Sequence, residues 1–199
     1  MTSGKRHDRI TLWSAPLVAI ASLWATRSAE LTLASVAGFL FSGLMFGPDL
    51  DIYSRHFMRW GWLRWLWLPY RRLIPHRSLL SHGIIIGTLL RLVYLFSWLS
   101  LAIALIGVLA HYGWGYTIDW GWWILQTWDW SMQHRWLILA GFCGLELGSV
   151  LHILTDRLDS WLRRRGRLNR IYRDHKLDKL KKTRPQGRSP NFRGKSPHP

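Results

Sequence analysis

The sequence predicts an all-α integral-membrane protein, a helical bundle with about four membrane-spanning segments. Three observations predict this class. Four apolar runs recur within the first 156 residues, tryptophan and arginine cluster at the ends of these runs, and Lys and Arg are spread unevenly over the connections. Residues 1–156 carry 12 Lys and Arg against 8 Asp and Glu, whereas residues 157–199 carry 15 against 3, so the apolar body and the basic tail are distinct parts.

The four apolar runs are the candidate spans. They cover residues 12–25, 31–47, 83–110 and 136–154. The first run reaches the roughly 20 residues that a span needs only when Ile10 and Thr11 join it. The second is rich in Gly, Ala and Ser, which let membrane helices approach closely, and Gly47-Pro48 ends it.

Two charged residues lie inside the later runs. Arg91 is in the third run and Glu146 is in the fourth. Ionisable residues within a span are costly, so each needs a partner or a role. We expect Glu146 to pair with Arg91, to be a buried protonated acid, or to support a neighbouring functional group.

Two tryptophan-rich stretches flank the third run. Residues 53–75 alternate bulky aromatic side chains with arginine, which suits the headgroup layer and predicts a helix in the membrane plane. Residues 111–135 are also dense in tryptophan but contain Arg135 as their single Lys or Arg. This second stretch predicts the aromatic belt on the opposite face of the membrane.

The distribution of Lys and Arg predicts the topology. The leader, the first tryptophan-rich stretch and the tail are rich in both, whereas the other two connections hold only Arg27 and Arg135. Four spans with both termini in the cytoplasm satisfy the positive-inside rule. Residues 1–160 then form a membrane-embedded helical domain, and residues 161–199 form a basic cytoplasmic tail that is helical to Lys182 and disordered beyond it.

This topology brings candidate metal ligands from four segments to the cytoplasmic face. They are His7 before the first span, Asp49 and Asp51 after the second, His76 and His82 before the third, and His152 and Asp156 at the end of the fourth. A mixture of imidazoles and carboxylates suits zinc, manganese or iron better than calcium, and seven candidates suffice for two ions. The single cysteine, Cys143, excludes a cysteine-rich zinc site.

The spacing of these residues predicts local structure. His152 and Asp156 are four residues apart, so they share one face of a helix. His76 and His82 are six apart and cannot share a face of a regular helix, so a loop or a helix start must separate them. Ser78 or Ser81 can cap such a helix.

A two-metal site would bind phosphoryl oxygens and activate water, which predicts phosphoester hydrolysis. The catalytic candidates are Arg77, which can stabilise charge on the transferred group, and Asp51, as a ligand or the support of one. A simpler interpretation stays open, in which each histidine is a polar residue at the membrane interface and Arg77 anchors to lipid phosphate. His56, in the basic stretch, is ambiguous.

The same residues carry a resemblance. The early His7, Pro48-Asp49-Leu50-Asp51, the stretch from His76 to His82 and His152-Ile153-Leu154-Thr155-Asp156 resemble the YdjM-like family of bacterial membrane-bound, metal-dependent hydrolases. The leader and the stretch 47–54 are similar to a related bacterial family of uncharacterised metal-binding proteins.

The resemblance covers residues 1–160 and implies a fold distantly similar to zinc-dependent phospholipase C and the single-strand nucleases. It implies a divalent metal, zinc first, and a location in the bacterial inner membrane. It also marks His7, Asp49, His76, His82, His152 and Asp156 as the ligands. Ile52 and Ser81 depart from the family motif, which has His and Thr at those positions.

Two functions from different classes follow. The first is a metal-dependent hydrolase whose site faces the cytoplasmic headgroup layer, with membrane lipid as a natural phosphoester substrate. The second is a non-catalytic metal-binding membrane protein whose basic tail docks a partner or anionic lipid. The tail contains no recognised nucleic-acid motif, so no specific nucleic acid is expected, and the oligomeric state stays open.

Overall fold

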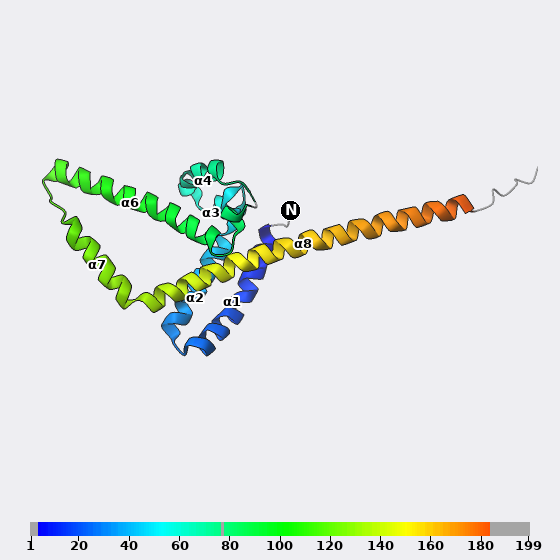
Figure 1. Ribbon diagram of the computed structural model, residues 1–199, viewed down its shortest axis with the longest axis horizontal. Helices are drawn as coiled ribbons and strands as arrows, with labels where there is room; N and C mark the ends of the chain where they lie inside the picture. Colours follow the sequence, from blue (N-terminus) through cyan, green and yellow to red (C-terminus); the bar gives the residue numbers. More distant parts are fainter. Residues whose placement is uncertain (1–3, 77, 184–199) are drawn as a thin grey trace, which may run out of the picture. The chain divides into compact units, whose positions relative to one another are not determined.

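The computed structural model describes residues 4–76 and 78–183, with side chains as far as residue 170, and all regular secondary structure in this part of the chain is helical (Figure 1). In order, the elements are α1 (Gly4–Thr26), α2 (Ala29–Leu44), η1 (Pro48–Asp51), α3 (Arg55–Arg59), η2 (Gly61–Leu66), α4 (Trp67–Leu73), α5 (Leu79–His82), α6 (Ile86–Trp114), α7 (Trp120–Gln133) and α8 (Arg135–Thr183). The chain divides into two compact units, Met1–Arg157 and Leu158–Pro199. The all-α prediction is confirmed for the described residues, and α8 remains helical just past Lys182.

Among the described residues, three helical segments are long and apolar enough to cross a membrane. They are Ala29–Asp51, Ile86–Trp114 and Arg135–Arg170. The sequence predicted about four, and α1 is the segment that does not qualify. Its first turns carry Lys5, Arg6, Asp8 and Arg9, which shorten the apolar part of this helix.

Helices α1 and α2 form an antiparallel hairpin. Their connection is only Arg27 and Ser28, and the Ser28 hydroxyl accepts a hydrogen bond from the Leu31 N–H at 3.3 Å, which caps the start of α2. At the other end of the hairpin, Thr11 of α1 lies against Gly43 of α2 so closely that a Cβ at position 43 would be 2.4 Å from the threonine methyl group. The absence of a side chain at Gly43 therefore sets the approach of these helices.

Helix α8 crosses α2 through a second set of small residues. A Cβ at Gly144 would lie 2.0 Å from the Ser35 carbonyl oxygen, and Gly148 is similarly close to the backbone of α2. The hydroxyl groups of Ser42 and Ser149 form a buried hydrogen bond of 3.0 Å across the same contact. Small residues at a helix crossing were predicted for the second apolar run, and here they bring the two backbones together.

The stretch 53–75 is not the single in-plane helix that we predicted. It folds as three short helices, α3, η2 and α4. Gly61, the first residue of η2, has φ +56°, a conformation that glycine adopts without strain. Part of its aromatic content also has another role. Trp67 and Tyr70 are buried with Phe46 and Leu50 in the main hydrophobic cluster, so these side chains anchor the turn η1 and do not face lipid.

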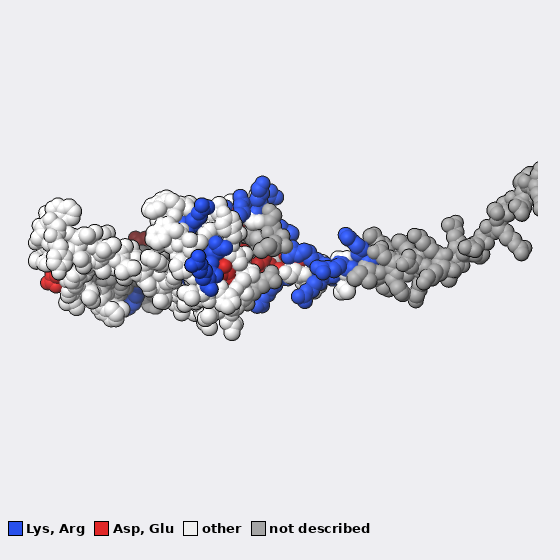
Figure 2. All heavy atoms as spheres, turned by 90° about the horizontal axis from the view of Figure 1, so that it is seen from above, with Lys and Arg blue, Asp and Glu red and all other residues white. Residues whose placement is uncertain are grey.

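Helix α7 connects the ends of α6 and α8 that lie away from α5 (Figure 1). Gly115 at φ +71° ends α6, and the Asp119 carboxylate accepts a hydrogen bond from the Trp122 N–H at 3.0 Å to begin α7. Figure 2 shows charged side chains gathered over the start of α1 and the α3–α4 region, whereas the surface over the far ends of α6 and α7 is almost entirely uncharged on that face. The charged end is where the candidate ligands lie.

Candidate metal centre

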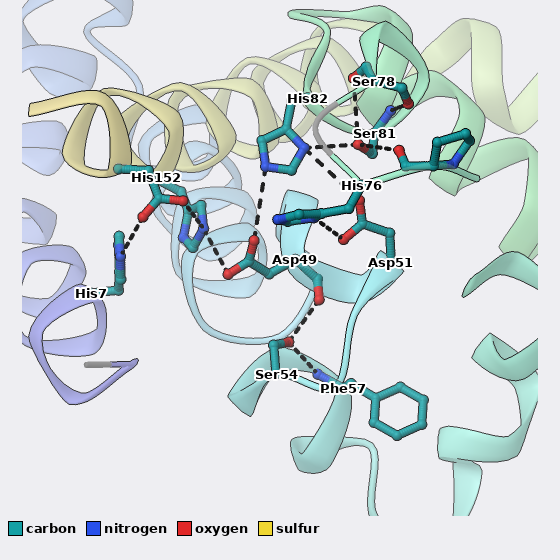
Figure 3. A network of polar contacts seen from close by, with 12 residues as sticks. His7, Asp49, Asp51, Ser54, Phe57, His76, Ser78, Ser81, His82 and His152 are labelled. Atoms are coloured by element: carbon teal, nitrogen blue, oxygen red, sulfur yellow. Dashed lines mark hydrogen bonds and ion pairs between the residues drawn. The ribbon is translucent and has the colours of Figure 1, made fainter. Parts of the chain in front are cut away.

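Four segments that are distant in sequence bring histidines and carboxylates to one place, the start of α1, the turn η1, the α5 region and the end of the first unit in α8 (Figure 3). Among the described residues, three groups could each hold a metal ion, since their ligand atoms lie within 4.8 Å of one another. The groups are His7–His152–Asp156, Asp49–His76–His82 and Asp49–His56–His152. The first two share no residue, and together they contain all six ligands that the sequence resemblance marked.

The first group joins the start of α1 to the part of α8 that belongs to the first unit. His7 Nε2 lies 3.2 Å from Asp156 Oδ1, and the His7 ring stacks on the His152 ring with centroids 4.3 Å apart. His7 and His152 are both buried, and each lies four residues from a close helix contact, Thr11 in α1 and Gly148 in α8 respectively. The helix crossings therefore position this group one turn beyond the packed core.

Asp49 stands between the two independent groups. Its Oδ2 lies 3.2 Å from His152 Nε2, and its Oδ1 lies 3.9 Å from His82 Nε2. Figure 3 shows this carboxylate pointing toward both imidazoles. The rings of His76 and His82 are 5.2 Å apart and nearly perpendicular, at 81°. One carboxylate thus faces ligand atoms of both groups.

Hydrogen bonds at one nitrogen of each ring indicate which nitrogen is left to bind a metal. His82 Nδ1 lies 2.8 Å from Ser81 Oγ, and that hydroxyl can donate its own proton to the Pro75 carbonyl at 3.4 Å. His82 then donates from Nδ1 and keeps a lone pair on Nε2, toward Asp49. His56 Nε2 similarly contacts the Gly43 carbonyl at 3.0 Å, which leaves the lone pair on Nδ1.

Several buried polar atoms of the centre have no hydrogen-bond partner among the described residues. They include His56 Nδ1, His82 Nε2, His152 Nε2 and Asp51 Oδ2. His152 Nε2 is close to Asp49, but the geometry between them is not that of a hydrogen bond. Buried polar groups are normally satisfied, so nitrogen and oxygen atoms left open around a common centre fit a metal cation.

Two imidazoles of the centre, His56 and His82, favour the neutral form that a metal requires. Burial, reinforced by the neighbouring His152, lowers the pKa of His56 to about 4. Burial also lowers the pKa of His82, although the nearby carboxylates of Asp51 and Asp49 oppose the shift. Both rings therefore offer a lone pair at neutral pH.

Asp51, a predicted catalytic candidate, contacts the candidate ligand His76 directly. Its buried carboxylate Oδ1 accepts a hydrogen bond of 2.9 Å from His76 Nδ1. Such a carboxylate orients an imidazole and raises its basicity. The other catalytic candidate, Arg77, lies outside the described residues. As predicted, a helix start separates His76 from His82, and Ser78 caps it by accepting from the Ser81 N–H at 3.3 Å.

His56 is the member of the centre that sequence reasoning did not select. It reaches the centre because the chain reverses after η1, where Ser54 caps α3 and donates to the Asp49 carbonyl at 2.7 Å. Gly47 makes room for its ring, since a Cβ there would be 2.5 Å from His56 Cε1. No spacing in the basic stretch marks this histidine.

Comparisons with known proteins support the metal-binding part of these expectations. A curated protein described as "Uncharacterized protein" from Aquifex aeolicus (strain VF5) is 37% identical over 59 residues, which is 29% of this chain and 41% of that protein. No solved structure matches the chain, so the expected similarity to the zinc-dependent phospholipase C fold has no support.

The family comparison extends over most of the chain. The model described as "Uncharacterized metal-binding protein (DUF2227)" matches residues 2–166, which include every candidate ligand described above. This match supports the resemblance of the leader and residues 47–54 to a family of uncharacterised metal-binding proteins. It does not support the resemblance to the YdjM-like hydrolases. The chain therefore belongs to the DUF2227 family of uncharacterized metal-binding proteins.

Proposed function

We propose that this protein holds two divalent metal ions, zinc being the first candidate, and hydrolyses a phosphoester in the headgroup layer of the membrane. One observation carries the proposal: two independent groups of two histidines and one carboxylate, His7–His152–Asp156 and Asp49–His76–His82, adjoin at Asp49. Two imidazoles and a carboxylate with an open coordination position are typical of catalytic zinc. Manganese and iron accept the same donors.

The residues divide into ligands and supports. In this proposal Asp49 would be a ligand of the Asp49–His76–His82 group, Asp51 would orient His76, and Ser81 would orient His82. A bound pair of such ions supplies a polarised phosphoryl oxygen and a water molecule that is deprotonated near neutral pH. In the hydrolysis, the water oxygen bonds to phosphorus, the ester P–O bond breaks and the leaving oxygen takes up a proton. The role of Arg77 in stabilising charge on the phosphoryl group stays a prediction.

The location supports a lipid substrate. Helix α1 has 23 residues, about 34 Å at the 1.5 Å rise of an α-helix, and it lies antiparallel to the apolar α2. If α2 crosses the membrane, α1 must return through it, which makes four crossings. The contact between His7 and Asp156 then brings both ends of the embedded unit to one face. We propose that this face is the cytoplasmic face of a bacterial inner membrane, because the Arg-rich segments adjoin it.

The hydrolase proposal can be tested with full-length protein in lipid nanodiscs. Zinc, manganese and iron forms should be assayed for release of phosphorylated headgroup or of phosphate from phospholipids, and for release of p-nitrophenol from bis(p-nitrophenyl) phosphate. Asp49→Asn should lower turnover by at least about 100-fold, because it removes the shared carboxylate charge. His111→Ala, at an exposed histidine far along α6, is the matched control and should retain full turnover. If the wild-type protein retains both ions and hydrolyses neither substrate, the hydrolase proposal fails and the non-catalytic metal-binding function remains.

In the alternative function, a non-catalytic metal-binding membrane protein, one observation favours lipid binding by the basic residues 157–170. Residues 157–170 contain six arginines and one aspartate, and residues 161–170 are all exposed, including the apolar side chains of Trp161 and Leu162. Arginine with tryptophan on a helix that directly follows a candidate span suits an anionic membrane surface.

Site-directed labelling tests the lipid proposal. A spin label at Trp161→Cys, in a Cys143→Ser background, should gain oxygen accessibility when acidic lipid is added to nanodiscs. Replacing Arg163, Arg164 and Arg165 with Gln should abolish that gain. A label that is equally accessible in neutral and acidic nanodiscs would exclude the lipid surface as the partner of this segment.

A further inference from the structure

The segment that carries His82 is held at both ends by charged side chains from other helices. At its start, Arg91 of α6 donates from Nη1 to the Ser81 carbonyl at 3.0 Å. At its end, the Glu146 carboxylate of α8 accepts a hydrogen bond from the Ile85 N–H at 3.2 Å. Arg91 is only 1% exposed. A pair between these two charges was one of the three alternatives that the sequence left open for Glu146. Within the described residues no ion pair joins them, and each binds the backbone beside His82.

The backbone at Ile85 needs such a restraint. Ile85 has φ +67° and ψ −57°, and the Ile86 N–H donates to the Ile84 carbonyl at 2.8 Å, which is the geometry of a strained γ-turn. A β-branched residue in this region costs free energy and persists only where surrounding contacts impose it. The Glu146 carboxylate supplies one such contact, three residues after His82.

Arg91 also connects the two groups of candidate ligands, Asp49–His76–His82 and His7–His152–Asp156. Its Nη2 donates to Thr88 Oγ1 and to Ser149 Oγ, both at 2.9 Å. Ser149 precedes His152 by three residues on α8, and Ser81 directly precedes His82. The planar guanidinium fixes the directions of these hydrogen bonds relative to one another, which a lysine ammonium cannot do. One buried side chain therefore links the backbone beside His82 to the helix turn that carries His152.

We propose that Arg91 and Glu146 are positioning residues that hold His82 opposite Asp49, so that the Asp49–His76–His82 group is preformed. This inference rests on the proposed two-ion site. Neither side chain is a ligand, so both act through His82. Loss of Glu146 should weaken the Asp49–His76–His82 group and leave the His7–His152–Asp156 group intact, because its hydrogen bond goes to the backbone beside His82.

The test isolates each group by removing the other. His152→Ala leaves only Asp49–His76–His82, and Asp49→Ala leaves only His7–His152–Asp156. Zinc affinity is measured by chelator competition on full-length protein in detergent, and cobalt substitution gives a visible spectrum of the remaining group. In the His152→Ala background, Glu146→Leu should lower zinc affinity about tenfold or more and alter the cobalt spectrum. Glu146→Gln keeps a carbonyl acceptor and should restore most of the affinity.

The Asp49→Ala background serves as the internal control, where Glu146→Leu should change zinc affinity less than threefold. Arg91→Lys should show an intermediate loss in the His152→Ala background, and Arg135→Met, which removes an arginine at the far end of α8, should show none. Equal loss in both backgrounds, or an unchanged cobalt spectrum with Glu146→Leu, would overturn the positioning role. If wild-type protein and both backgrounds bind no metal, the proposed two-ion site itself fails.

Discussion

The most direct prediction concerns how many metal ions each variant retains. Every candidate group contains Asp49 or His152, and each of these residues is absent from one group. Asp49→Ala therefore leaves His7–His152–Asp156 complete, and His152→Ala leaves Asp49–His76–His82 complete. We expect two ions per wild-type chain, one ion in each single variant, and none in the double variant.

The magnitude follows from the ligand count. Each group provides three protein ligands, so removing one leaves two. Loss of an outer hydrogen-bond partner of a ligand already costs roughly 10- to 100-fold in metal affinity, so loss of the ligand itself should cost at least about 100-fold. This corresponds to about 3 kcal/mol of binding free energy. At a free zinc concentration about tenfold above the wild-type Kd, an intact group should be mostly filled and the depleted group mostly empty.

The assay is elemental mass spectrometry on detergent-purified protein after dialysis against buffered zinc, with chelator competition for the affinities. His111→Ala should retain two ions, since His111 lies in the exposed end of α6. A double variant that still holds a stoichiometric ion would refute the assignment of ligands. So would a single Asp49→Ala substitution that empties both groups while helicity is unchanged.

Three further predictions concern packing and protonation. Gly47→Ala places a Cβ 2.5 Å from His56 Cε1, so the imidazole ring must move. We expect the free energy of unfolding, measured by SDS titration, to fall by about 1–3 kcal/mol. Gly113→Ala is the control and should not lower it, because the space around Gly113 is open. Gly148→Ala places a Cβ 2.7 Å from the Phe39 carbonyl oxygen at the α2–α8 crossing and should destabilise the fold by a similar amount, in contrast to the open Gly166→Ala. The third prediction is a pH dependence of the metal-free protein. The pKa of His56 is about 4 in the folded state against 6.5 when unfolded, so the unfolded state binds more protons between these values and stability should fall as pH drops through this window. The loss should reach about 3 kcal/mol, and His56→Leu should remove most of it; a stability that rises toward pH 4 would contradict the burial argument.

Much of the candidate centre could be predicted from local patterns. The Gly-Pro stop before Asp49, the four-residue spacing of His152 and Asp156, and the serine cap before His82 each depend on residues close in sequence. The all-α architecture follows from apolar runs of span length, which are also patterns of residues close in sequence. The orientation argument then suggested that the four segments share one membrane face, and all six predicted ligands do meet in the structure.

What only the tertiary structure decided depends on contacts between distant segments. His56 joins the centre because the chain reverses after η1, and no local pattern marks that reversal. Trp67 and Tyr70 are core residues and not part of an interfacial belt, because they pack against Phe46 and Leu50 across the turn. Arg91 and Glu146 bind the backbone beside His82 and not each other, since the hydrogen bonds available to a buried charge depend on which backbone groups the fold leaves open. The sequence by itself determined the helices and most of the ligand types, whereas the packing of α1, α2 and α8 determined which of those ligands face one another.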